Sequence, residues 1–111
     1  MENSIENLDE IFTALADPTR RAIVQRLAKS DATVGELHAP FAISAPAISR
    51  HLKVLEQAGV IQRTTDAQRR RISLRPQALQ PVSDWVGEQR SFWEASLARL
   101  EKVLEIHHVE D

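Results

Sequence analysis

The sequence predicts a mainly α-helical fold with a small β-hairpin. Apolar residues recur at helical spacings of three and four along both ends and much of the centre of the chain. Between Val60 and Arg75 this period disappears, and apolar Ile72 and Leu74 alternate with polar neighbours, as in a β-strand. We therefore expect about five or six helices and one two-stranded antiparallel hairpin.

Length and composition indicate one domain over residues 1–111, because 111 residues of which 42% are hydrophobic can bury one modest core. No run approaches the roughly 18 to 20 apolar residues of a membrane span, and the first ten residues are acidic, unlike a secretory signal. We expect a cytoplasmic protein without a membrane partner. The absence of cysteine excludes disulfides, thiolate-bound zinc and a thiol redox switch.

Two helices are predicted at the N-terminal end. The first ends near Asp17 and has apolar residues at helical spacing: Ile5, Leu8, Phe12 and Leu15. Asp17 can cap the second helix by accepting a backbone N–H bond, and Pro18 fits its first turn. This second helix has a buried side at Ile23 and Leu27, and we expect it to end at about Ala28.

Two further helices are predicted around a short turn. After a polar loop over residues 29–32, Thr33 caps a short third helix that Pro40 limits. Ser44 caps a fourth helix, and Gly59 lies where a C-terminal stop belongs. One side of the fourth helix is apolar: Ile48, Leu52 and Leu55.

A long helix is predicted at the C-terminal end, after a short turn or half-helix bracketed by Pro76 and Pro81. It has more large apolar side chains than so small a core needs, which predicts a homodimer whose first and last helices pack together. The alternative is that these residues cover the monomer's own core. The expected dimer residues are Leu8, Phe12, Phe92, Trp93, Leu97, Leu100 and Leu104.

Charge is segregated along the chain although the net charge is only −2. Residues 1–17 contain five acids and no base, residues 18–75 contain eleven bases and four acids, and residues 76–111 contain three bases and seven acids. A basic central segment suits a polyanionic partner such as nucleic acid. Ordinary solvated helix charge is the alternative.

The predicted order of a helix, a short turn, a second helix and a basic hairpin is that of a winged helix-turn-helix, which inserts one helix into the DNA major groove. On the fourth helix, Arg50 and Lys53 lie opposite the apolar side, where they can donate to guanine or phosphate. His51 lies about 60° from the apolar centre and can face either the core or the DNA. We expect double-stranded operator DNA to contact Ser44, Ala45, Pro46, Ser49, Arg50, His51 and Lys53.

The hairpin contains five arginines and the single acid Asp66. On a protruding loop such charges suit sequence-independent phosphate contacts. Protection of an exposed sheet edge is the alternative explanation. We assign the phosphate contacts to Arg69, Arg70 and Arg71.

Two stretches resemble the ArsR-type family of bacterial repressors. They are Asp17-Pro18-Thr19-Arg20-Arg21-Ala22-Ile23 and residues 43–61, which include Ile48-Ser49-Arg50-His51-Leu52-Lys53. The similarity extends from about Leu8 to Leu74 and is weaker over the last helix. It implies a dimeric winged-helix repressor that releases its promoter when an inducer binds; the inducer of this chain is unknown.

The sensor sites of metal-binding family members are missing. A Cys-x-Cys pair is typical of the third helix, where this chain has Glu36-Leu37-His38-Ala39-Pro40-Phe41, and no histidine follows Asp84 at the interface position of the last helix. We therefore expect no cofactor and no metal. A cluster of possible ligands lies at the C-terminal end: His107, His108, Glu110 and Asp111. We interpret it as part of a frayed tail, with a metal site as the weaker alternative.

One further feature resembles a branch of this family, and one departs from the family pattern. Phe92-Trp93-Glu94 is similar to a run in the cysteine-free branch. Asp66-Ala67-Gln68 stands where family wings commonly have glycine, which argues against a tight turn because positive φ is costly at Ala.

Two other classes of function compete with a transcription regulator. An enzyme is disfavoured, because the chain has no cysteine nucleophile, no glycine-rich phosphate loop and no His pair at metal-binding spacing. A protein-interaction module on the same fold, without DNA binding, would be favoured by an acidic face on the fourth helix, where this chain has Arg50 and Lys53. The sequence predicts a homodimeric, sequence-specific DNA-binding repressor without a thiolate metal sensor.

Overall fold

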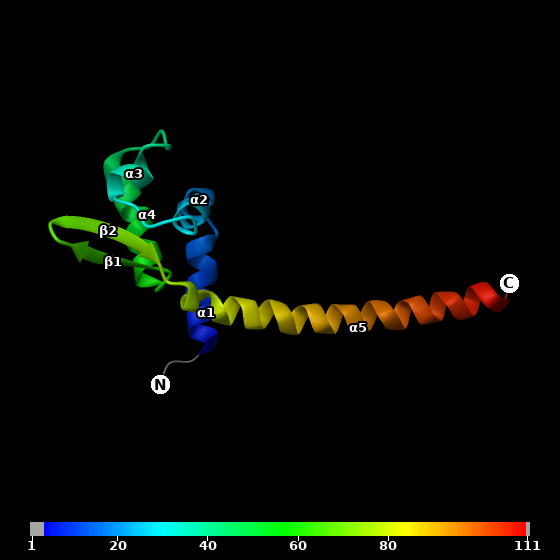
Figure 1. The fold of residues 1–111 in the computed structure, drawn as a ribbon. Coiled ribbons are helices and arrows are strands. Elements are labelled where there is room, and N and C mark those ends of the chain that lie inside the picture. The colour runs from blue at the N-terminus through cyan, green and yellow to red at the C-terminus, as the bar shows by residue number, and fades with distance from the viewer. Residues whose placement is uncertain (1–3, 111) are drawn as a thin grey trace. The chain divides into compact units, whose positions relative to one another are not determined.

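The structure, a computed structural model, describes the backbone of residues 4–110 and the side chains of residues 8–105. Figure 1 shows its elements, which confirm the predicted winged-helix fold class. The chain forms two compact units, residues 1–81 and residues 82–111. In order, the elements are α1 (Ser4–Leu15), α2 (Pro18–Leu27), α3 (Val34–His38), α4 (Ala45–Gln57), β1 (Ile61–Asp66), β2 (Arg69–Leu74), the 3₁₀ turn η1 (Pro76–Leu79) and α5 (Gln80–Glu110).

The core of the first unit combines residues from α1 to α4 with the base of the hairpin. Within α1, the core-facing residues are Ile11 and Ala14, whereas Leu8 is half-buried and Phe12 is 39% exposed. The helical spacing of Leu8 and Phe12 thus marks an adjoining apolar side rather than the side that faces the core. The buried apolar residues are Ile11, Ala14, Ile23, Leu27, Ala32, Leu37, Ile48, Leu52, Leu55, Val60, Ile61 and Ile72.

Three helices begin at the caps that the sequence predicts. The Asp17 carboxylate accepts the backbone N–H of Arg20 at 3.0 Å, and chiefly this bond holds the Asp17 pKa below its usual value. The Ser44 hydroxyl accepts the N–H of Ala47 at 3.2 Å. Thr33 forms a reciprocal capping box, accepting the Glu36 N–H at 3.2 Å while its own N–H donates to Glu36 at 2.8 Å.

The end of α4 positions the hairpin. Gly59 has φ +79°, a left-handed conformation that glycine adopts without a Cβ clash, and it turns the chain from α4 into β1. A Cβ at this position would also lie 3.4 Å from the Arg75 guanidinium. The predicted helix stop is confirmed.

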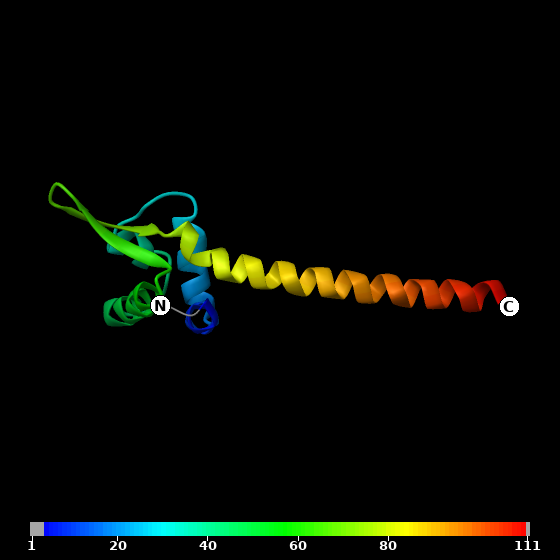
Figure 2. The ribbon, with the colours of Figure 1, turned by 90° about the horizontal axis from the view of Figure 1, so that it is seen from below.

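The hairpin pairs Ile61 with Leu74 at its base and Asp66 with Arg69 at its tip. Its two-residue turn contradicts the expectation that the sequence Asp66-Ala67-Gln68 disfavours a tight turn. Ala67 adopts φ +57°, so the ladder closes despite the strain of a left-handed alanine. Figures 1 and 2 both show the tip of the hairpin projecting beyond the helices of the first unit.

The loop before α3 also joins the sheet. Ala32 forms an antiparallel bridge with Ile72, with N–H···O distances of 3.0 Å and 2.7 Å. Both residues are buried, so the bridge connects the middle of β2 to the core of the first unit. The sequence predicts only a polar loop here, because the pairing spans 40 positions of chain.

The second unit contains α5 from Val82 onward; the whole helix, Gln80–Glu110, has 31 residues. Pro76 begins η1 as predicted, whereas Pro81 lies in the first turn of α5, where its missing N–H removes no helical bond. Most large apolar side chains of α5 are exposed in the single chain, including Trp93 at 62%. Across the described residues, no helix combines the length and hydropathy that crossing a bilayer requires.

Candidate DNA-binding site

The turn between α3 and α4 is held by a histidine. The Nε2 of His38, at the end of α3, lies 2.7 Å from the carbonyl oxygen of Ile43, just before the Ser44 cap. Because a carbonyl only accepts, Nε2 must carry the proton that is shared in this bond. The contact fixes where α4 begins relative to α3, and it gives His38 a structural role.

Helix α4 separates an apolar side from a polar side as the sequence predicts. Ile48, Leu52 and Leu55 are buried. Ala45, in the first turn of α4, is exposed but lies about 60° from Ile48, nearer to the apolar side. The opposite side, which we call the outer face of α4, is exposed at Pro46, Arg50 and Lys53, with Ser49 at its edge. Its two charged groups are cations, so this face suits a polyanion that approaches the start of the helix.

The start of α4 adds donors to this face. Unpaired backbone N–H groups and the helix dipole favour an anion at a helix N-terminus. The Ser44 oxygen already accepts from Ala47, which leaves the Ser44 hydroxyl hydrogen as a donor. A phosphate next to the α4 N-terminus would therefore meet both charge and hydrogen-bond donors.

His51 points towards the start of α2, not into the apolar core. Its Nδ1 lies 3.3 Å from the Nη1 of Arg20 and 3.8 Å from the Asp17 carboxylate, and the side chain is 22% exposed. An arginine can only donate, so in the Arg20 contact Nδ1 is the acceptor and Nε2 carries the proton. His51, which we expected to contact DNA, therefore contacts Arg20 and Asp17 of the protein itself.

The three hairpin arginines differ in their surroundings. Side chains alternate along a strand, so Arg69 and Arg71 share one face while Arg70 lies on the other. Arg69 and Arg71 line a shallow hollow of about 530 Å³ at the tip. Asp66 is directly opposite Arg69, whereas Thr65 is opposite Arg70, so Arg70 has no acid as its cross-strand neighbour.

An ion pair connects the hairpin to α4. The Nε of Arg63 on β1 donates to the Glu56 carboxylate at 3.1 Å, and both side chains are exposed. Sequence reasoning missed this pair, because the six intervening residues turn the chain through Gly59. Glu36, which completes the cap of α3, was also missed, although Thr33-x-x-Glu36 is a capping-box signature.

Comparisons with known proteins agree with this geometry. A family model described as "Helix-turn-helix domain" matches residues 15–64. The transcriptional repressor SdpR of Bacillus subtilis is 39% identical over 79 residues, which cover 71% of this chain and 88% of SdpR. An HTH-type transcriptional regulator of Mycobacterium tuberculosis is 46% identical over 71 residues, 64% of this chain and 66% of that protein.

A solved structure extends the similarity to the last helix. The crystal structure of an ArsR family transcriptional regulator superposes with a TM-score of 0.75 at 38% identity, covering 85% of this chain and 97% of that one. This chain belongs to the ArsR family. ArsR-family proteins are transcription regulators, which is the class of function that the sequence predicts.

In this ArsR-family protein the α3 residues Glu36, Leu37 and His38 have structural roles. Glu36 caps α3, Leu37 is buried, and His38 bonds the turn before α4. No group of three or more His, Cys, Asp or Glu residues that could hold a metal occurs within the described side chains. His107 and His108 lie in α5, outside the residues whose side chains the structure describes.

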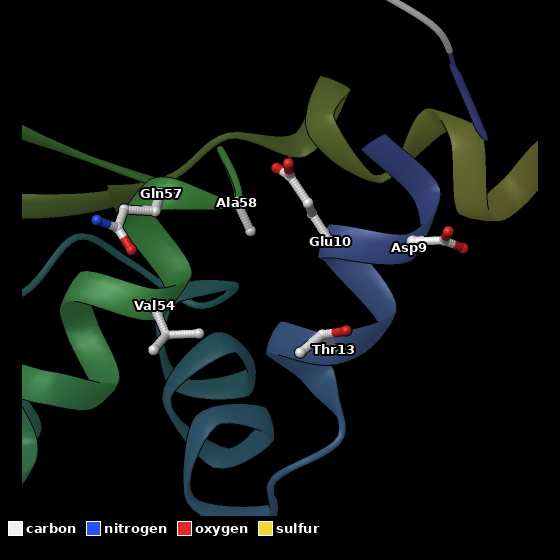
Figure 3. A pocket seen from close by; sticks show the side chains of 6 residues that line it. All are labelled: Asp9, Glu10, Thr13, Val54, Gln57 and Ala58. Carbon is white, nitrogen blue, oxygen red and sulfur yellow. The ribbon is translucent and has the colours of Figure 1, made fainter. Parts of the chain in front are cut away.

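A groove of about 380 Å³ lies between α1 and the C-terminal part of α4 (Figure 3). Its charged lining residues, Asp9 and Glu10 of α1, are both acids. Negative charge repels phosphate, so this end of α4 is unfavourable for DNA. The cationic outer face near the α4 start is the more favourable side. The uncharged residues that line the groove between α1 and α4 are Thr13, Val54, Gln57 and Ala58.

Proposed function

We propose that this protein is a homodimeric, sequence-specific DNA-binding repressor, with α4 in the major groove and the hairpin on the flanking phosphates. The observation that carries the proposal is the outer face of α4, where Arg50 and Lys53 are exposed opposite a fully buried apolar side. Arg50 lies near the start of the helix, the end that reaches base edges in helix-turn-helix proteins. Its planar guanidinium matches the O6 and N7 acceptors of guanine.

The hairpin supports the same orientation. Arg69 and Arg70 are exposed near a tip that projects beyond the helices, as backbone-contacting wings do. Arg71 is partly buried closer to the core. Such contacts contribute affinity for any DNA sequence, whereas base contacts from α4 contribute the preference for an operator.

Exposed apolar side chains on α5 support the dimer. Trp93, Leu97, Leu100 and Leu104 are spaced by four, three and four residues, the spacing of a coiled-coil seam. They are between 53% and 62% exposed in the single chain, as is Phe92 at 61%. A contiguous apolar stripe of this kind is stabilised by burial against a partner, and a two-fold axis would pair it with the same stripe of a second copy. Leu8 and Phe12 of α1 would complete the interface.

The proposed repressor does not use a thiolate metal sensor. Soft metal ions such as zinc and arsenite are held in sensor sites by thiolates, and this chain has no cysteine. The residues at the corresponding place in α3 cap, pack and bond within the fold. Any release signal must therefore act through a different kind of contact.

Selection from a random duplex library tests the proposed function. The purified protein should enrich one sequence with two half-sites about one helical turn apart, because a two-fold dimer presents two copies of α4. Fluorescence anisotropy should then show tighter binding to the selected duplex, the operator, than to a scrambled duplex of equal composition. Enrichment of no sequence, with equal and weak affinity for all duplexes, would favour the protein-interaction module instead.

A further inference from the structure

Arg20 connects three segments of the first unit through one side chain. Its Nε donates to the carbonyl oxygen of Ala14 at 2.6 Å, and its Nη2 donates to that of Thr13 at 3.1 Å. Both acceptors belong to the last turn of α1, where carbonyls lack the usual partner four residues on, and the Thr13 carbonyl also accepts the backbone N–H of Ala16 at 3.2 Å. The third nitrogen, Nη1, lies 3.3 Å from the Nδ1 of His51 on α4.

The start of α2 holds Arg20 in place. The Asp17 carboxylate caps α2 by accepting the backbone N–H of Arg20, and it also lies 3.8 Å from the His51 Nδ1. Arg20, Asp17 and His51 are each only partly exposed, which limits competition from water. The α1–α2 corner therefore presents a fixed donor to one side of α4.

The contact between Arg20 and His51 affects how α4 is oriented towards DNA. His51 lies between Arg50 on the outer face and buried Leu52. Apolar packing along Ile48, Leu52 and Leu55 attaches α4 to the core, but it is non-directional and permits small rotations about the helix axis. A hydrogen bond is directional, and base contacts tolerate errors of only about 10–20° in orientation.

We propose that Arg20 is a positioning residue that fixes the rotation of α4 through His51, so that Arg50 faces the DNA bases. This inference rests on the proposed DNA binding and deepens it. It assigns His51 a role through Arg20 rather than through the DNA. Arg20 itself contacts no base.

Neighbouring residues supply matched controls. Arg21 donates to the carbonyl of Leu15 at 2.8 Å, so Arg21→Met removes an equivalent bond at the end of α1 without a contact to α4. His51→Asn keeps an oxygen acceptor close to the place of Nδ1, whereas His51→Leu removes the acceptor and retains most of the volume. Arg20→Met retains the aliphatic stem of Arg20 and removes its three donor nitrogens.

The test is a double-mutant cycle read as binding to the operator and to the scrambled duplex, at a temperature where circular dichroism shows every variant folded. Arg20→Met and His51→Leu should each lower operator affinity by about fivefold or more while changing scrambled-duplex affinity by less than about twofold. In the Arg20→Met background, His51→Leu should have almost no further effect. His51→Asn and Arg21→Met should bind the operator like wild type. If Arg20→Met does not fold, Arg20→Lys takes its place in the cycle.

Two results would overturn the positioning role. One is that His51→Leu lowers operator affinity by the same factor in both backgrounds, which means that His51 acts independently of Arg20. The other is that Arg21→Met reproduces the loss, which means that only the stability of α1 matters. If wild type itself shows no preference for the operator, the proposed function fails; if that preference exists and the cycle shows no coupling, only this inference fails.

Discussion

The Glu56 carboxylate on α4 accepts a hydrogen bond from the Nε of Arg63 on β1 at 3.1 Å, and this pair ties the hairpin to the helix that it follows. Exposed ion pairs stabilise a fold little, because water and salt screen them. The pair's main effect is on charge, because Glu56 neutralises one of the hairpin's arginines, Arg63.

Replacing that acid should strengthen non-specific binding. We expect Glu56→Gln to change the free energy of unfolding by less than about 1 kcal/mol, and to steepen the salt dependence of binding to scrambled duplex by about one ion. The measurement is a salt titration by fluorescence anisotropy, with Glu88→Gln on α5 as a control for loss of an acid elsewhere. A shallower salt dependence for Glu56→Gln would show that the pair holds Arg63 in a DNA-contacting position.

Glycine at position 67, in the strained turn of the hairpin, should stabilise the protein. Ala67 has φ +57°, where alanine is destabilised by roughly 1–2 kcal/mol relative to its usual conformations. Ala67→Gly should therefore stabilise the protein by about 0.5–1 kcal/mol after the greater freedom of glycine in the unfolded chain is subtracted. Urea unfolding measures this change. Gln68→Gly is the control, since Gln68 does not have positive φ, and an equal or larger gain there would contradict the strain argument.

Local signals in the sequence predict most helix boundaries. Asp17, Thr33 and Ser44 are correct caps because an N-cap bond depends on residues three positions apart. Features that depend on distant chain segments were not predictable in this way. The Ala32–Ile72 bridge exists because the fold brings the loop before α3 to β2, and periodicity carries no information about such a pairing.

In the candidate site, too, some features follow from local sequence and others depend on distant segments. Helical geometry is sufficient to place Arg50 and Lys53 opposite the buried side of α4. The same geometry leaves His51 between the two sides, and its contact with Arg20 depends on how the α1–α2 corner packs against α4. In the hairpin, the left-handed Ala67 is held by the six residue pairs that flank the turn, from Ile61–Leu74 to Asp66–Arg69. This register can be identified only from the structure.

A charged residue should disrupt the dimer when it is introduced in the apolar stripe of α5, but not on the opposite side of the helix. Leu100→Glu should convert the dimer into a monomer at micromolar concentration, because a carboxylate cannot be buried against a second copy without a partner. Ala98→Glu introduces the same residue on the opposite side of the helix, two positions away, and should leave the dimer intact. Sedimentation velocity distinguishes the two states. A wild-type monomer, or equal effects of the two substitutions, would contradict the proposed interface.

Thiophilic metals should not release the protein from DNA. We expect one equivalent of zinc or arsenite to leave operator affinity unchanged within about twofold, because the chain supplies no thiolate ligand. Anisotropy with and without the metal checks this. A tenfold loss of operator affinity with zinc would reveal a site built from other ligands, and a His107→Ala, His108→Ala double variant would then locate it.

The most direct test of the account compares Arg50→Ala with Arg70→Ala on operator and scrambled duplexes across a salt titration, with Arg99→Ala on α5 as the control for loss of an exposed arginine. Arg50→Ala should weaken operator binding by roughly 1–3 kcal/mol and change scrambled-duplex binding little. Arg70→Ala should weaken both and reduce the salt dependence by about one ion. If Arg50→Ala weakens both duplexes equally while Arg70→Ala affects only the operator, the two roles are reversed. If both variants bind both duplexes like the control, α4 and the hairpin do not form the DNA interface.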